Sequence, residues 1–160
     1  MVELAGQLIV LEEFLSHRST PEQAGSTFSL SEIKHFDEPL QETWLDQDEE
    51  DNVFQVLIPD DSIAFITAIG LSPVRKGDYY FWKDGHKEQS ACTHTYGTID
   101  SPTQFEIGLL SANSEIKFTG HNDDDQKGYF RVLCRGFWVK RDLVDEFFAT
   151  LGRSGVKVTA

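Results

Sequence analysis

Alternating apolar and polar residues, interrupted by turn residues, restrict the fold of this chain more than any other feature. Phe54, Val56 and Ile58 repeat at a spacing of two within residues 53–58. Successive side chains of a β-strand point to opposite faces of the sheet, so this spacing indicates a strand with one buried face. Similar patterns predict further strands over residues 63–69, 78–83, 87–96, 104–110, 116–118 and 129–139.

Local signals indicate how some of these strands are arranged. Residues 63–69 are apolar on both faces of the predicted strand, which is typical of a central strand that is covered on both sides. The dipeptide Asp84-Gly85 predicts a tight hairpin turn, because glycine tolerates a positive φ. Gly136, inside the long strand 129–139, predicts a β-bulge.

Helices are expected at both ends of the chain. Leucines recur at helical spacing within residues 2–16, although a continuous apolar run leaves a strand over residues 7–14 open. Residues 141–151 carry an apolar stripe at helical spacing, and Asp142 favours the N-terminal end of that helix dipole. We therefore predict an α+β fold, with a mainly antiparallel β-sheet of about seven strands, an N-terminal helix and a C-terminal helix.

Acidic residues are concentrated in the first part of the chain. Residues 1–61 contain 15 Asp or Glu and two basic residues, whereas residues 62–160 contain 12 of each kind. The whole formal charge of −13 therefore belongs to the first part. We expect a single domain over residues 1–160, with an acidic segment, 1–61, and a charge-balanced, β-rich body, 62–160. Such a division of charge bears on a surface and its partners rather than on the fold.

Two runs of carboxylates are the strongest candidates for a binding surface. Residues 46–51 form the densest run, and residues 123–125 are three consecutive aspartates. In a calcium loop that began at Asp46, Asp51 would replace the glycine and Leu57 the final glutamate. In one that began at Asp123, Cys134 would replace the final glutamate, so a dedicated calcium site is not expected. We predict that these runs, with one aromatic residue of the strand 78–83, contact a basic protein partner. The predicted partner-binding residues are Asp46, Asp48, Glu49, Glu50, Asp51, Asp123, Asp124, Asp125 and Trp82.

The cysteines and histidines do not form a recognisable reactive or metal-binding motif. Cys92 and Cys134 are expected to be free thiols of a cytoplasmic protein. Cys92 and His94 share one face of a predicted strand, but their backbones are about 6.5–7 Å apart, which makes direct contact awkward. No zinc-ligand spacing is present, and neither a metal nor a cofactor nor a catalytic residue is predicted.

Several classes of function are disfavoured by what the sequence lacks. There is no phosphate-binding glycine motif, no nucleophile elbow and no HExxH motif. Net negative charge opposes nucleic-acid binding, because phosphate contacts require a positive groove. No apolar run approaches the ~18 residues of a membrane span, and no secretory signal is expected.

Three functions are compatible with these observations. The leading hypothesis is an acidic protein-binding module, such as an inhibitor or immunity-type neutraliser of a basic nuclease or toxin, because carboxylates can speed the capture of a basic partner. The second is a structural or accessory subunit of a larger assembly, whose aromatic surface carries the contact. The third is a small enzyme or small-molecule binder with dispersed site residues.

Overall fold

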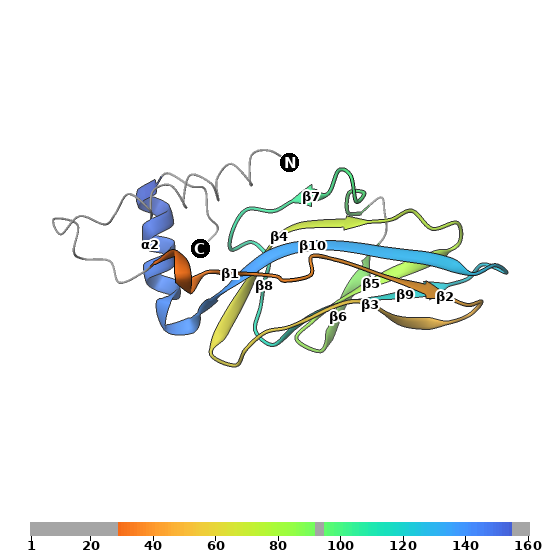
Figure 1. Ribbon diagram of the computed structural model, residues 1–160, viewed down its shortest axis with the longest axis horizontal. Coiled ribbons are helices and arrows are strands. Elements are labelled where there is room, and N and C mark those ends of the chain that lie inside the picture. The colour runs from red at the N-terminus through yellow and green to blue at the C-terminus, as the bar shows by residue number, and fades with distance from the viewer. Residues whose placement is uncertain (1–28, 92–94, 155–160) are drawn as a thin grey trace.

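The computed structural model describes residues 29–91 and 95–154 (Figure 1). These residues form two antiparallel β-sheets and, after the last strand, a helix. Sheet A contains β1 (Lys34–His35), β2 (Leu40–Leu45), β4 (Ser62–Leu71), β7 (Thr103–Gln104), β8 (Ser111–Ala112) and β10 (Gly128–Lys140). Sheet B contains β3 (Glu50–Leu57), β5 (Gly77–Lys83), β6 (His86–Ala91) and β9 (Glu115–Asn122). The helical elements are the short 3₁₀ helices η2 (Leu30–Glu32) and η3 (Arg141–Leu143) and the helix α2 (Val144–Ser154).

Strand β10 lies at the centre of sheet A. It pairs with β1 and β2 along one edge and with β4 along the other, and β4 in turn pairs with the short strands β7 and β8. The strand order of sheet B is β3-β9-β5-β6. The turn between β2 and β3 joins an edge of one sheet to an edge of the other. The described part of the acidic segment is therefore built into both sheets, and the division at residue 61 is one of charge and not of structure.

Aromatic and branched side chains of the two sheets form the main core between them. Sheet B contributes Phe54, Phe81 and Phe118, and the Phe81 and Phe118 rings stack with centroids 4.8 Å apart. Contact across the sheets includes the edge-on pair of Tyr79 and Phe130, with centroids 5.2 Å apart. These residues are buried, as expected for the inward faces of two packed antiparallel sheets.

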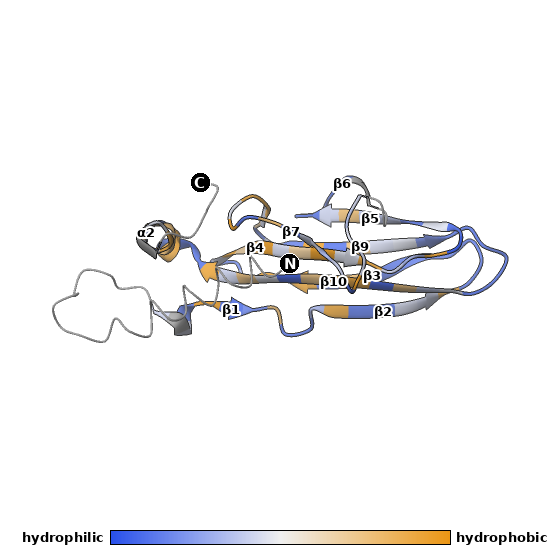
Figure 2. Cartoon of the chain, turned by 90° about the horizontal axis from the view of Figure 1, so that it is seen from above, coloured by the Kyte–Doolittle hydropathy of each residue, from blue (hydrophilic) through white to orange (hydrophobic). Residues whose placement is uncertain are grey.

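A second core covers the part of the outer face of sheet A that lies next to α2. Helix α2 packs there through Phe147, whose ring lies 5.9 Å from Phe65 and 5.5 Å from Phe137, centroid to centroid. Figure 2 shows hydrophobic residues along β4, which is buried by sheet B on one side and by this cluster on the other. The prediction of a strand apolar on both faces over residues 63–69 is thereby confirmed.

The predicted bulge is present and has a clear structural cause. Arg135 pairs with Ala68 but Gly136 pairs with Ile66, so Thr67 is an extra residue in β4. A Cβ at Gly136 would lie 2.4 Å from the carbonyl oxygen of Phe65, which only glycine avoids. The shift in register changes which residues of the two strands face each core.

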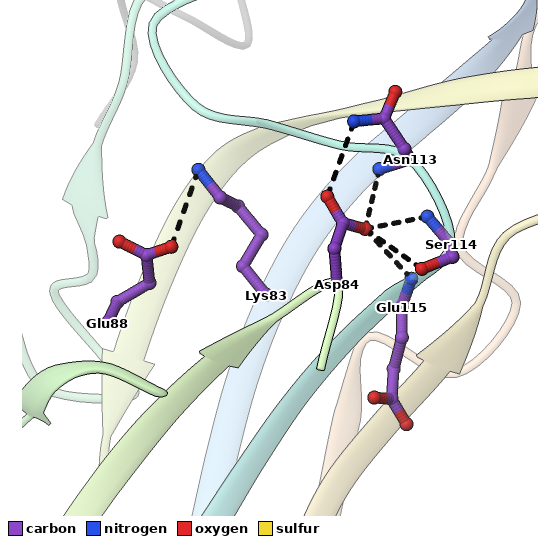
Figure 3. Close-up of polar contacts among 6 residues, drawn as sticks. All are labelled: Lys83, Asp84, Glu88, Asn113, Ser114 and Glu115. Carbon is purple, nitrogen blue, oxygen red and sulfur yellow. Dashed lines mark hydrogen bonds and ion pairs between the residues drawn. The ribbon is translucent and has the colours of Figure 1, made fainter. Parts of the chain in front are cut away.

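The predicted hairpin turn at Asp84-Gly85 is also confirmed. Asp84 and Gly85 have φ angles of 52° and 80° and join β5 to β6. The Asp84 carboxylate accepts hydrogen bonds from the backbone N–H groups of Asn113 (2.8 Å) and Ser114 (2.7 Å), as Figure 3 shows. Partial burial alone would raise the pKa of Asp84, but the hydrogen bonds from Ser114, Asn113 and Glu115 outweigh it and lower the pKa. Asp84 thus fastens the β5–β6 hairpin to the turn before β9.

Three sequence-based expectations about the fold need revision or lie outside the structure. The described residues contain ten strands in two sheets, and not about seven in one. The two-residue strands β1 and β8 leave no alternation to read, and β2 is not predicted because its middle residues, 41–43, are all polar. The predicted strand over residues 104–110 is wrong beyond Gln104: Ile107 enters the second core, Leu109 is 55% exposed, and Gly108 has a φ of 96°. The predicted helix over residues 2–16, and its alternative strand over 7–14, lie outside the described residues. At the other end, the C-terminal helix is present and runs to Ser154.

Candidate functional site

The two acidic runs meet at the end of the sandwich farthest from α2 (Figure 1). The backbone N–H of Asp48 donates to the carbonyl oxygen of Asn122 (2.8 Å), and the N–H of Asn122 donates to the carbonyl oxygen of Glu49 (3.0 Å). The β2–β3 turn therefore lies against the end of β9, next to the β9–β10 loop. We call residues 46–51 and 123–127 the acidic tip.

Asn122 holds the two halves of the acidic tip together. Asn122 is buried, with 1% of the residue's surface exposed. Its amide nitrogen shares two hydrogens among the carbonyl oxygens of Leu45 (3.0 Å), Asp46 (3.2 Å) and Gln126 (2.9 Å), while its Oδ1 accepts the N–H of Asp124 (3.1 Å). An aspartate could not make the first three bonds, because an ionised carboxylate only accepts. A short polar side chain thus fixes one turn against the other.

Some carboxylates of the acidic tip are engaged within the protein. Lys127 Nζ lies 3.3 Å from Asp46 Oδ1, and Arg75 Nε lies 3.3 Å from Oδ2 of the buried Asp124. The Glu49 carboxylate accepts the backbone N–H of Asp46 (2.6 Å), which closes the β2–β3 turn. These residues stabilise the acidic tip and are poorly placed to be the main contacts of a partner.

The acidic tip retains a large negative charge after this pairing. It holds eight carboxylates, and the cations in and next to it are Arg75, Lys76 and Lys127, which leaves a formal charge of −5. Asp48, Asp51 and Asp125 are exposed, and within residues 29–91 and 95–154 no lysine or arginine forms an ion pair with their carboxylates. Asp48 also adopts a positive φ of 57°, which aspartate tolerates better than most residues. These three carboxylates are therefore both exposed and available to a partner.

The other predicted residues connect the acidic tip to the outer face of sheet B. His121 Nδ1 lies 3.1 Å from Asp123 Oδ1. Glu50 Oε1 accepts a long hydrogen bond from Thr119 Oγ1 (3.5 Å), and Thr119 Oγ1 accepts the indole N–H of Trp82 (3.0 Å). Trp82 is therefore linked to Glu50 through one hydroxyl group.

Lysines cover the aromatic residues around Trp82. Lys117 Nζ lies 5.0 Å from the Trp82 ring centroid, and Lys87 Nζ lies 3.5 Å from that of Tyr80. Burial, followed by the charges of Asp78, Glu50 and Asp123, raises the pKa of Tyr80. Both rings are only half-buried, so this face of sheet B is a mixed aromatic and charged surface.

Sequence reasoning missed a cavity that adjoins the acidic tip. Its volume is about 410 Å³. Strand pairing places Trp44 of β2 opposite Tyr129 of β10, and their rings stack with centroids 4.6 Å apart. Nothing local in the sequence links two aromatic residues so far apart. The cavity is lined by Trp44, Ser72, Pro73, Val74, Arg75, Asn122, Asp124, Gln126, Lys127, Gly128, Tyr129 and Arg131.

Cys134 is unsuited to nucleophilic chemistry. It is fully buried in the core between the sheets, and burial raises the pKa of its thiol far above the usual value. It is a free cysteine. Cys92 and His94, the pair that sequence analysis weighed, lie outside the described residues.

The described residues contain neither a metal-binding cluster nor a membrane-spanning helix. Within residues 29–91 and 95–154, no three His, Cys, Asp or Glu side chains are grouped so that they could hold a metal ion. None of the helices in this part of the chain has the length and apolar character needed to cross a membrane. Comparison with protein-family models, with curated proteins and with solved structures gives no match.

Proposed function

We propose that this protein is an acidic protein-binding module that engages a basic partner through the acidic tip. The observation that carries the proposal is the joining of two carboxylate runs, 46–51 and 123–125, into one surface by Asn122. The two runs are separated by more than 70 residues of sequence. Their combination has a formal charge of −5 together with the neighbouring cations.

Physical reasoning supports a role in recognition over one in solubility alone. A surface held by backbone and side-chain hydrogen bonds loses little conformational entropy when a partner docks. Concentrated charge of one sign also steers an oppositely charged partner and raises its association rate, at low salt most of all. Solubility needs no such fixed arrangement, because dispersed carboxylates provide it equally well.

A finer version of the proposal is inhibition of a basic nuclease or toxin. A site that binds phosphate groups is rich in Lys and Arg, and carboxylates fixed on a rigid turn can occupy such a site. Asp48, Asp51 and Asp125 are the residues best placed for this contact, because they are exposed and none of the described lysines and arginines pairs with them. Asp46, Glu49 and Asp124 instead hold the tip together.

The proposal is tested with two charge-matched variants. The tip variant carries Asp48→Asn, Asp51→Asn and Asp125→Asn, and the control variant carries Asp37→Asn, Asp60→Asn and Asp100→Asn. All six aspartates are exposed, so both variants lose three negative charges at the surface.

Affinity purification from cells, followed by mass spectrometry, then compares the two variants with the original protein. We expect one basic partner to be retained by the original protein and by the control variant, and to bind the tip variant about ten-fold or more weakly. Equal retention of the same partner by the tip variant would contradict the proposal.

The accessory-subunit hypothesis makes the opposite prediction for the same partner. In that case, Trp82→Ala would abolish retention while the tip variant would behave like the original protein. The lysines that lie over Tyr80 and Trp82 argue against a dry aromatic contact there, because burying them would require their desolvation.

A further inference from the structure

The cavity of about 410 Å³ beside the acidic tip is a second candidate binding site, and Trp82 is not among its lining residues. It lies at the end of sheet A, against β2, β10 and the loops that follow β4 and β9. Its volume falls within the range of small-molecule pockets. The residues that carry the following argument are Trp44, Arg75, Asp124, Lys127, Tyr129 and Arg131.

An open aromatic ring forms one wall of this cavity. Trp44 is 57% exposed, which is unusual for a tryptophan of a paired strand. Its ring is backed by Tyr129, at 4.6 Å between centroids and 22° between planes. A hydrogen bond with Glu42, followed by partial burial, raises the pKa of Tyr129. Stacking on Tyr129 holds the Trp44 indole in place, while much of the indole surface stays free to stack against a ligand.

The charges around the cavity cancel in pairs. Each of its three cationic side chains has a carboxylate 3.2–3.3 Å away. The pairs are Arg75 with Asp124, Lys127 with Asp46, and Arg131 with Glu42. Such an arrangement offers donors and acceptors side by side, and it leaves no unpaired cation in the cavity wall for an anionic ligand.

Asp124 adds a buried acceptor to the wall. Its side chain is 6% exposed, and its Oδ1 has no hydrogen-bond partner among the described residues. A buried carboxylate oxygen without a donor is costly, and a hydroxyl group of a ligand or of water is the natural complement.

We propose that this cavity binds a neutral saccharide ring, which stacks on Trp44 and hydrogen bonds to the paired charges. A pyranose ring has one face made largely of C–H groups, which suits an aromatic surface. Its edge carries hydroxyl groups, each of which donates and accepts, and these suit side chains that alternate between the two roles. This proposal does not rest on the proposed contact between the acidic tip and a basic protein, although Asp124 and Lys127 belong to both sites.

The test uses soluble oligosaccharides and calorimetry with the full chain. Cellohexaose, xylohexaose, mannohexaose and chitohexaose are titrated at up to about 1 mM, with adenosine as a planar aromatic ligand that also stacks. We expect at least one oligosaccharide to bind. Trp44→Ala should weaken that binding about ten-fold or more, and Asp124→Asn should weaken it to a smaller extent. The control is Leu57→Ala, because Leu57 is also an exposed apolar residue but lies on sheet B, away from the cavity lining. Leu57→Ala should leave the affinity for the oligosaccharide unchanged.

Folding of each variant is checked by its thermal midpoint, and Trp44→Phe provides a second test that keeps an aromatic surface. We expect Trp44→Phe to restore most of the binding that Trp44→Ala loses. The proposal is overturned if none of the four oligosaccharides binds, if adenosine alone binds, or if Trp44→Ala and Leu57→Ala bind with equal affinity.

Discussion

Replacement of Asn122 by alanine should separate the two halves of the acidic tip and destabilise the whole fold. The substitution removes two N–H donors, which three carbonyl oxygens share, and the acceptor of one backbone N–H. Each hydrogen bond contributes about 1 kcal/mol net, and an unsatisfied buried partner costs more. Water can reach the partly buried partners, such as Gln126, more easily than the Leu45 carbonyl. We therefore expect Asn122→Ala to lower the free energy of unfolding by about 3 kcal/mol.

Urea denaturation followed by circular dichroism measures this loss, which corresponds to a midpoint lower by about 1–2 M. Asn52→Ala is the control, because Asn52 is exposed on β3 and should change the free energy of unfolding by less than about 0.5 kcal/mol. Hydrogen exchange should also show faster exchange at the amides of Asp48 and Asp124 in Asn122→Ala. If the free energy of unfolding falls by less than about 1 kcal/mol and both amides stay protected, the role assigned to Asn122 is refuted.

Three further predictions concern other parts of the fold. The folded pKa of Asp84 is lowered, so its stabilising effect is present above an unfolded pKa of about 3.9 and is lost as the pH falls through the lower folded value. Asp84→Asn should therefore cost about 1–2 kcal/mol at pH 7, and denaturation at a series of pH values should show this difference shrinking below pH ~4. In Cys92→Ser, the buried Cys134 should not react with a thiol reagent at about pH 8 until the protein is denatured, and reaction at the rate of a free thiol would contradict its burial. Phe147→Ala should lower the free energy of unfolding by about 3–4 kcal/mol, because it empties the cluster under α2, whereas Ala149→Lys, at an exposed position of the same helix, should change it by less than about 0.5 kcal/mol.

Two features of the fold could be predicted because single residues signal them. The Asp84-Gly85 turn follows from the positive φ that glycine tolerates. The bulge is signalled by a glycine inside a long strand, although its cause, the close approach of Gly136 to Phe65 of β4, is not local. The division into two sheets could not be predicted, because alternation within a strand does not say which sheet the strand joins. Phe105, Ile107 and Leu109 are apolar at a spacing of two, yet they do not share one face of a strand. Phe105 packs against the main core, Ile107 enters the second core, and Leu109 is exposed after the positive φ of Gly108.

The candidate site could be predicted in part for the same reason. Runs of carboxylates are visible in the sequence, so both halves of the acidic tip were predicted. Their joining depends on Asn122, a single polar residue whose partners lie up to 77 positions away. The stacking of Trp44 on Tyr129 depends likewise on strand register, which a single sequence does not specify. Conversely, Asp124 looks like a surface residue in the sequence but is buried against Arg75.

A hydrogen-exchange footprint of the complex with the captured basic partner tests the acidic tip as a binding surface most directly. We predict slower exchange in residues 46–51 and 123–127 when the partner is bound, with little change in β5, β6 and α2. The protection should weaken as salt is raised, because screening reduces attraction between exposed charges. Protection confined to the Trp82 face of sheet B, with the acidic tip unchanged, would contradict the account.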